Sequence, residues 1–404
     1  MRAWLSAFFL GAVFAHHASA AEFSTSPWGE DFHLIPFAAI TAIDLPDIAA
    51  NAVAVDAANE KISLAPHIEE HGPSFGLEIG SRLDHSSLGP LRWRAKGFYT
   101  LATGSDSVSV DTAFGAFAWQ GLLGGNNEAA AAADLAAGIG TAAVARSDGE
   151  GFRLNSYSAA VTEAGATAAA GSAGSLGSAF AAAGNIGDLG LSVSYDSEIT
   201  YWGGEFAVAL DSGDGGASLS PWAGPVFRGL QRELTSELRE YSFAQGRFSL
   251  HETLDGQSWG MIIGLDLRAP LGGTLAADLS LAAAPLLTAA HYEGHEVNGA
   301  SFAAAPLETS SVRQDPVQPG LLARASGGIS FGLGGGALLR LGGEVEYLSA
   351  VPSLARSFDG AVSADAEEAS ASAGSCCGTS TPLAEIVFGD MLAYGASLSL
   401  DIPF

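Results

Sequence analysis

The sequence predicts an all-β protein, a transmembrane antiparallel up-and-down β-barrel of about 12 strands, with 10 and 14 strands as alternatives. Three observations predict this fold. The N-terminus carries an export signal, apolar and polar residues alternate along pairs of segments joined by short Gly-rich turns, and charged residues in those segments keep to the polar face.

The first 20 residues have the pattern of a secretory signal peptide. Arg2 provides the positive start, an apolar stretch follows, and Ala-Ser-Ala at positions 18–20 provides the small-residue cleavage site. A short buried helix is the alternative interpretation. Further along, the longest uncharged run, 164–187, consists mostly of Ala, Gly and Ser and is too weakly apolar for a transmembrane helix. We therefore expect an exported protein without a helical anchor.

The charge balance excludes several classes of partner. The chain has 17 Lys and Arg against 44 Asp and Glu, a formal net charge of −27. Nucleic acid is excluded as a partner, because phosphate recognition needs clusters of basic residues. The same balance excludes the basic amphipathic face of a peripheral membrane protein.

Four β-hairpins account for the clearest alternating segments. Each has large apolar residues at every second position on both sides of a short turn. The hairpins are expected at 75–101, 202–232, 259–281 and 321–347. Long acidic segments separate them, at 105–188, 233–256, 293–319 and 353–383. Short turns at one end and long loops at the other are typical of an outer-membrane barrel, with the turns in the periplasm and the loops outside the cell.

The hairpins lead to a division of the chain and to a strand count. Residues 21–72 are expected to form an N-terminal segment that holds the first strand, a periplasmic arm or both. The barrel is expected over 73–404, with an Ala/Gly/Ser-rich insert at about 105–188, in which the run 164–187 is expected to be a flexible or loosely helical extracellular loop. Four hairpins and two flanking strands give ten strands, and a further pair at 152–160 and 189–195 gives 12.

Charged residues within the predicted strands fall almost entirely on the face opposite the large apolar residues. An Arg or Lys that faced hydrocarbon would cost ~2–4 kcal/mol at the bilayer midplane, so this face is predicted to line the lumen. A β-sandwich with its apolar face inside is the alternative. The predicted lumen residues are Glu78, Arg82, Arg92, Arg94, Lys96, Glu205, Arg228, Asp266, Arg268, Asp278, Arg324, Arg340, Glu344, Glu346 and Asp401.

One row of these charges has two interpretations. Arg92, Arg94 and Lys96 share a face, with neighbours ~6.6–6.8 Å apart along the strand. In a water-filled lumen they would favour anions. In a packed lumen they would pair with acidic residues and seal the barrel. The sequence leaves both open, because the width of the lumen depends on the number of strands.

The chain ends on the alternating segment YGASLSLDIPF. This terminus resembles that of Gram-negative outer-membrane barrels, which finish on a strand with a terminal Phe. The resemblance implies that the last strand closes the barrel and is recognised by the barrel-assembly machinery. The residues of this signal would be Tyr394, Leu398, Leu400, Ile402 and Phe404.

A narrower resemblance involves three internal segments. Residues 72–108, 219–230 and 258–287 follow one another in an order and spacing similar to the Legionella-type major outer-membrane, pore-forming family. The resemblance implies a pore-forming barrel and no catalytic residues. The insert at 105–188 departs from the pattern of that family.

The two cysteines, Cys376 and Cys377, are adjacent in the chain. An exported protein meets oxidising conditions, but each cysteine has only its neighbour as a partner within the chain. A vicinal disulfide, two free thiols and intermolecular bridges are all open.

Histidines occur in two pairs spaced four apart, His67 with His71 and His291 with His295. Neither pair has a Glu directly after its first His, as the zincin motif requires, so we expect solvated loops and no metal. A hydrolase could be built only from His251, His291 and His295 with Asp255 or Glu293, and no nucleophile motif accompanies them.

The sequence thus favours a porin-like outer-membrane barrel, a passive diffusion channel for small solutes or ions. It is expected to be no enzyme and to need no cofactor. Its expected partners are outer-membrane lipid, the assembly machinery and the solutes, and a homo-oligomer is open. The first alternative is a closed structural or adhesive barrel that acts through its extracellular loops, and the second is an outer-membrane hydrolase.

Overall fold

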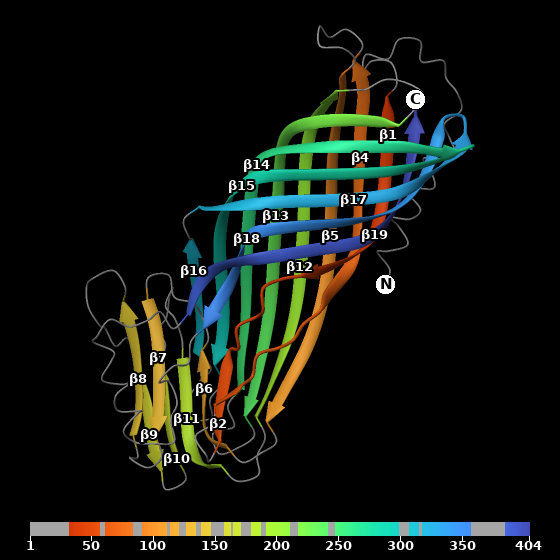
Figure 1. Ribbon diagram of the computed structural model, residues 1–404. Coiled ribbons are helices and arrows are strands. Elements are labelled where there is room, and N and C mark those ends of the chain that lie inside the picture. Colours follow the sequence, from red (N-terminus) through yellow and green to blue (C-terminus); the bar gives the residue numbers. More distant parts are fainter. Residues whose placement is uncertain are drawn as a thin grey trace.

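Ten long strands form a closed antiparallel ring in the computed structural model (Figure 1). Each strand of the ring pairs with the one that follows it in the ring, and the last pairs with the first. The strands are β1 (His33–Asp44), β4 (Glu70–Leu83), β5 (Leu91–Val110), β12 (Leu191–Leu210), β13 (Ser218–Glu240), β14 (Arg247–Gly272), β15 (Leu275–Asn298), β17 (Gln318–Gly334), β18 (Ala337–Arg356) and β19 (Ala384–Pro403).

The structure describes the chain in fifteen stretches. These are residues 32–56, 61–83, 91–110, 114–120, 127–134, 139–146, 157–162, 165–170, 179–186, 191–210, 217–240, 247–298, 307–314, 317–356 and 384–404. Within them, no helix is long and apolar enough to cross a membrane. The signal peptide, Cys376 and Cys377 lie outside the described residues.

Further strands lie outside the ring. The strand β16 (Leu307–Gln314) pairs with β15 beyond the point where β17 ends. Connector and insert strands join in a six-stranded sheet of β3 (Lys61–Ser63), β2 (Ala52–Asp56), β6 (Phe114–Gln120), β11 (Ala179–Ile186), β10 (Gly165–Ala170) and β9 (Tyr157–Thr162). A separate hairpin consists of β7 (Asn127–Asp134) and β8 (Ile139–Arg146).

The favoured count of 12 strands was therefore wrong by two, while the all-β barrel was predicted correctly. The expected strand at 189–195 is only the beginning of β12, whose later part had been counted separately. The expected strand at 152–160 overlaps β9, which belongs to the six-stranded sheet and not to the ring. The described parts of the insert are strands rather than helix, because tertiary pairing overrides the weak strand preference of Ala.

The two ends of the barrel differ in their connections. At one end, which we call the short-turn end, β14 ends at Gly272 and joins β15 through Gly273 and Thr274, and β17 joins β18 through Gly335 and Gly336. All four glycines have positive φ, between 60° and 113°, which explains the absence of a side chain there. The chain end lies here too, since the Phe404 N–H donates to the Phe32 carbonyl at 2.9 Å. The opposite, long-loop end carries the longest connections, among them those between β5 and β12 and between β18 and β19.

Strand β14 shows how the two halves of the barrel differ. Towards the short turn its outward residues are large and apolar, from Trp259 to Leu267. Towards the long-loop end the outward positions are polar, at His251, Thr253 and Asp255. Its inward residues change in the opposite sense, from Asp266 near the short turn to buried Phe248, Leu250 and Leu254. The side that is apolar thus switches along a single strand.

The same switch holds around the ring. Exposed large apolar residues form a belt over the short-turn half, including Leu77 on β4, Val208 on β12, Leu281 on β15, Ile329 on β17 and Tyr394 on β19. In the long-loop half the outward residues are polar, as at Ser105 on β5 and Asp196 on β12. The short-turn half has the pattern of a protein surrounded by lipid, and the long-loop half that of one surrounded by water.

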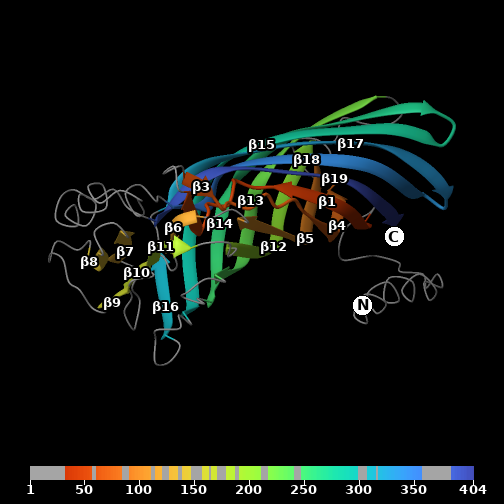
Figure 2. The same cartoon turned by 90° about the horizontal axis from the view of Figure 1, so that it is seen from below.

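Two segments fill the interior of the long-loop half. The connector between β1 and β4 buries Ile48, Ala52 and Leu64 against inward residues of β12, β13 and β14. Strand β18 turns inward at a bulge next to Ala350, whose φ is 61°. Beyond the bulge, Pro352 lies against Gly256 of β14, on a wall that faces β18 across the interior. Figure 2 shows β15, β17 and β18 as one wall and β5, β12 and β13 as the other.

Candidate functional site: the charged lumen and its closure

The short-turn half encloses a cavity of about 410 Å³. Its walls carry all the predicted lumen charges except Arg82 and Arg228. Arg82 is partly buried on β4, and Arg228 lies behind the inner end of the cavity. Basic and acidic residues occur in nearly equal number, so the cavity is close to neutral although the chain as a whole has a net charge of −27.

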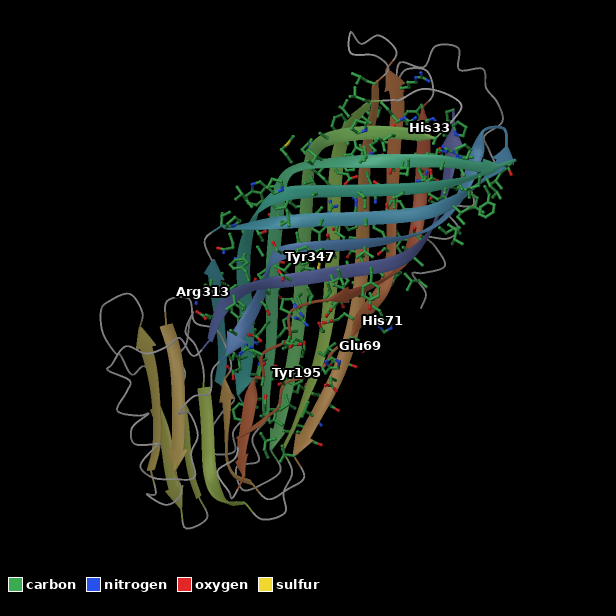
Figure 3. The ribbon with its side chains drawn as sticks, in the orientation of Figure 1. His33, Glu69, His71, Tyr195, Arg313 and Tyr347 are labelled. Atoms are coloured by element: carbon green, nitrogen blue, oxygen red, sulfur yellow. The ribbon has the colours of Figure 1, made fainter. Side chains whose placement is uncertain are left out.

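The outer part of the cavity is organised around ion pairs between strands. His33 of β1 contacts Asp401 of β19 at 2.9 Å, across the pair of strands that closes the ring. Figure 3 shows His33 near the short-turn end. Asp278 of β15 lies 3.4 Å from Arg340 of β18 and 3.8 Å from Arg268 of β14. These groups are partly exposed, so solvent screens them.

In the row of Arg92, Arg94 and Lys96, the second and third residues are partly buried and ion-paired, while Arg92 is exposed. Arg94 donates to Asp266 at 2.8 Å and stacks 4.2 Å above the Trp222 ring, whose Nε1–H donates to the same carboxylate at 2.9 Å. Lys96 donates to Glu344 at 3.1 Å. Arg92 also lines the cavity and has an interaction partner. This pairing favours the packed interpretation of the row over the anion-selective one.

A layer of four buried charges closes the inner end of the cavity. Arg228 donates two hydrogen bonds to Glu346, at 2.9 and 2.8 Å. Arg324 donates two to Glu205, at 2.8 and 3.0 Å. The pairs are joined, because Arg228 also lies 3.8 Å from Glu205. Between 1 % and 7 % of each of the four residues is exposed, so this layer, which we call the central quartet, is buried.

The central quartet draws on four different strands. Glu205 comes from β12, Arg228 from β13, Arg324 from β17 and Glu346 from β18, so the layer links opposite walls of the barrel. The Tyr201 hydroxyl donates to Glu346, and Arg228 lies 5.0 Å from the Phe98 ring. Two-point Arg–carboxylate pairs with further hydrogen bonds are the geometry that compensates for the desolvation of buried charges.

Beyond the central quartet the interior is apolar and filled. A buried cluster there includes Ile199, Leu230, Ile262, Leu322 and Val351. A water-filled channel would leave such inward side chains in contact with solvent, and each of these five is less than a twentieth exposed. The described part of the barrel therefore holds a blind cavity rather than a continuous passage.

The connector is tied into the long-loop half by Tyr195 of β12 (Figure 3). Its hydroxyl donates to the Leu64 carbonyl at 2.9 Å and accepts the Asn51 N–H at 3.3 Å. The Asn51 side chain donates to Ser236 at 3.1 Å. Burial raises the pKa of Tyr195 to about 12. The connector is thus held by directional bonds as well as by apolar contact.

Sequence reasoning missed this second set of interior polar groups. Glu70 accepts from Arg232 at 2.7 Å and from Ser197 at 3.1 Å. Nearby, Glu252 accepts from Tyr292 at 2.7 Å and pairs with Arg356. The segments 233–256 and 293–319 were expected to be loops, and both are largely strand. The signal that was missed is an alternation in which the apolar residues occupy the inward positions and the polar residues the outward positions.

The C-terminal residues of the predicted assembly signal lie on β19 and just beyond it. Tyr394 and Leu398 are exposed on the apolar belt. Phe404 follows the strand, with its ring centroid 6.2 Å from that of Phe32. The last strand pairs with the first strand of the ring, as expected of a closing strand.

The histidines of the hydrolase alternative come together on the outer surface. On β14 and β15, His251 lies opposite His295, Thr253 opposite Glu293, and Asp255 opposite His291. All six positions face outward, on the long-loop side of the apolar belt. Burial raises the pKa of Asp255, while His291 opposes this shift. Among the described residues, no group of three or more His, Cys, Asp or Glu is placed to hold a metal ion.

Comparison with known proteins adds little to this geometry. No protein-family model and no curated protein matches the chain, so the Legionella-type resemblance has no support from them. Among solved structures, the chain is similar to the outer-membrane protease OmpT from Escherichia coli, with a TM-score of 0.39 and 7 % identity over 95 % of this chain and 100 % of that one. A TodX deltaS2S3 mutant monoaromatic hydrocarbon channel has a TM-score of 0.23 and 8 % identity over 93 % of this chain and 91 % of that one. A Pseudomonas aeruginosa FadL homologue has a TM-score of 0.19 and 7 % identity over 93 % of this chain and 89 % of that one. Scores this low carry no argument about this chain.

Proposed function

We propose that the protein is a closed, non-conducting barrel of the bacterial outer membrane that acts through the structure at its long-loop end. The central quartet is the observation that carries this proposal. It spans the lumen with buried two-point ion pairs, and a filled apolar interior lies beyond it. This arrangement supports the closed-barrel alternative over the porin-like channel that the sequence favoured.

The membrane location rests on the belt of exposed apolar residues over the short-turn half. In water such a continuous belt would be an aggregation surface. In a bilayer it meets the hydrocarbon, and the charged residues inside are shielded from it. The belt lies next to the short-turn end, so the short turns are assigned to the periplasm and the long-loop end to the cell surface.

The long-loop end provides the surface through which such a barrel would act. There the connector strands β2 and β3 join strands of the insert in a second sheet. Among the described residues, acidic side chains occupy outward positions of the long-loop half, including Asp196 of β12, Asp255 of β14 and Glu293 of β15. We assign to this surface a structural or adhesive role without catalysis. The proposed partners are lipid around the belt and the assembly machinery at β19.

Conductance in planar lipid bilayers tests closure. Purified full-length protein should insert without producing stepwise current at any applied voltage up to membrane breakdown. Insertion is checked separately on lipid vesicles, by the mobility difference between heated and unheated samples on gels. Stepwise conductance from inserted protein would overturn the proposal and restore the channel.

Membrane location has its own test. In the source bacterium, the protein should fractionate with the outer membrane, and protease added to whole cells should cut within the long-loop connections and spare the belt. Recovery of the folded protein in the soluble periplasmic fraction would contradict the assignment whatever its conductance.

A further inference from the structure

The outward face of β14 and β15 carries a pair of histidines that share one cross-strand position. His251 and His295 are directly opposite each other in the antiparallel register, and both are exposed. Directly opposite residues have their Cβ atoms ~4.5–5.5 Å apart. Imidazole nitrogens bind divalent transition metals at about 2.0–2.1 Å, so two rings at this separation can reach one ion between them. We propose that His251 and His295 form a two-histidine site for a divalent transition metal such as Cu²⁺.

A neighbouring side chain orients one of the two rings. The Thr235 hydroxyl of β13 lies 3.0 Å from Nδ1 of His251. In the tautomer with its proton on Nδ1, His251 donates to this oxygen and keeps the lone pair of Nε2 for a metal. A metal-bound histidine usually makes such a hydrogen bond through its second nitrogen, which holds the ring in place. The contact is therefore a second observation that favours a ligand role.

The electrostatic surroundings also favour a cation. Glu293 lies on the same face two residues before His295, and Glu233 lies opposite Thr253 in the same register. Asp255 lies four residues after His251, opposite His291. These carboxylates, on a chain with a net charge of −27, raise the local concentration of cations.

The metal class follows from the ligands. Since no group of three ligands is placed to hold a metal within the described residues, the protein supplies two imidazoles and water completes the coordination. Imidazole suits copper, nickel and zinc, and the Irving–Williams order puts Cu²⁺ first. Mg²⁺ and Ca²⁺, which prefer oxygen ligands, should not compete. The site lies outside the apolar belt and is open to water.

Calorimetric titration of CuSO₄ into the folded, full-length protein in detergent at pH 7.5 tests the proposal. A background with Cys376→Ser and Cys377→Ser removes the thiols, which would bind copper themselves. We expect one Cu²⁺ per chain, with an affinity that falls about tenfold or more in His251→Gln and in His295→Gln. His291→Gln is the matched control, because this histidine lies on the same face opposite Asp255. The affinity of this variant for Cu²⁺ should stay within twofold of that of the background protein.

Two further measurements separate a built site from general adsorption. Thr235→Val should weaken binding through the loss of ring orientation. Electron paramagnetic resonance should show two nitrogen ligands on the bound Cu²⁺. Equal losses in all three histidine variants, or no loss in His251→Gln and His295→Gln, would overturn the proposal. Neither result would affect the conductance test, so this site and the closed barrel stand or fall separately.

Discussion

Removing one charge from the central quartet should destabilise the barrel far more than removing one from the outer cavity. The quartet is neutral, with Arg228 and Arg324 balanced by Glu205 and Glu346. Glu346→Gln leaves a net positive charge in a buried layer. It also replaces the carboxylate that accepts two hydrogen bonds from Arg228 and one from Tyr201.

The size of the effect follows from burial. Breaking a buried ion pair by removing one partner costs about 3–5 kcal/mol, because the other charge stays desolvated. Arg340→Gln is the matched control, since 39 % of the Arg340 side chain is exposed and its partner Asp278 lies in the outer part of the cavity. A pair of that exposure contributes about 0–1 kcal/mol. Both variants remove one charge from the same lumen, so the difference between them measures burial.

Equilibrium urea unfolding in lipid vesicles, followed by Trp fluorescence, gives the free energies of unfolding. A double variant, Arg228→Met with Glu346→Leu, separates the loss of a pair from the loss of one partner. It keeps the Arg324–Glu205 pair and should recover most of the stability lost in Glu346→Gln, because apolar residues of similar volume replace a buried pair at little cost. The reasoning is refuted if the stability of Glu346→Gln lies within about 1 kcal/mol of that of Arg340→Gln, or if the double variant is no more stable than the single one.

Three further predictions concern the belt, the connector and the packing of an aromatic ring. Ile263→Arg, in the belt, should destabilise the protein in vesicles by ~2–4 kcal/mol. Thr253→Arg, at an outward position of the same strand beyond the belt, should change stability little. Similar losses of stability in the two variants would argue against the proposed bilayer position. Tyr195 should remain protonated in the folded state until about pH 12. The unfolded chain ionises near pH 10, so the free energy of unfolding should fall by about 2–3 kcal/mol between these pH values, and Tyr195→Phe, monitored by urea unfolding at pH 9 and 11.5, should lack that component. An equal pH dependence in the variant would show that this hydroxyl is not the group responsible. Gly264→Ala should lower the urea midpoint, because the new Cβ would lie 2.3 Å from the Trp222 ring, whereas Gly327→Ala, whose Cβ would meet nothing nearer than 3.6 Å, should leave it unchanged or raise it. A midpoint equally lowered in both would mean that ring contact is not the cause.

The sequence was most informative in the strand segments that alternate between large apolar residues on one face and polar or small residues on the other. The outward series from Trp259 to Leu267, with Asp266 and Arg268 on the opposite face, predicted a barrel hairpin. The four expected hairpins correspond to eight strands of the ring. The predicted lumen charges nearly all line the cavity for the same reason, since an Arg facing hydrocarbon is costly.

The sequence was least informative where the strands leave the belt. His251, Thr253 and Asp255 occupy the outward positions that apolar residues hold further along β14. If apolar residues are assumed to face outward, the predicted strand ends there. The alternation in fact continues, because Phe248, Leu250 and Leu254 occupy the inward positions. In the proposed membrane position the surrounding medium changes from lipid to water at this point, which accounts for the change in the parity of the pattern. The expected loops at 233–256 and 293–319 were wrong for this reason.

Closure could not be derived from the sequence, because it depends on which residues meet across the lumen. Glu205 and Arg324 are 119 residues apart, and Arg228 and Glu346 are 118 apart. Their shared face was predictable, but their height along the barrel depends on the stagger of ten strands. The inward turn of β18 at Ala350 left no local signal either, since Ala is not a residue that marks positive φ.

The inward turn of β18 has a consequence for the order of assembly. The strand belongs to the wall as far as Leu348, and beyond Ala350 it packs in the interior together with β19, through Val351, Leu354 and Ile386. β19 is also the strand that meets β1 to complete the ring. The same hairpin therefore adds a packing layer to the interior of the long-loop half and closes the wall. A barrel without this hairpin would have both an open side and an unfilled core, so docking of the hairpin would remove both together.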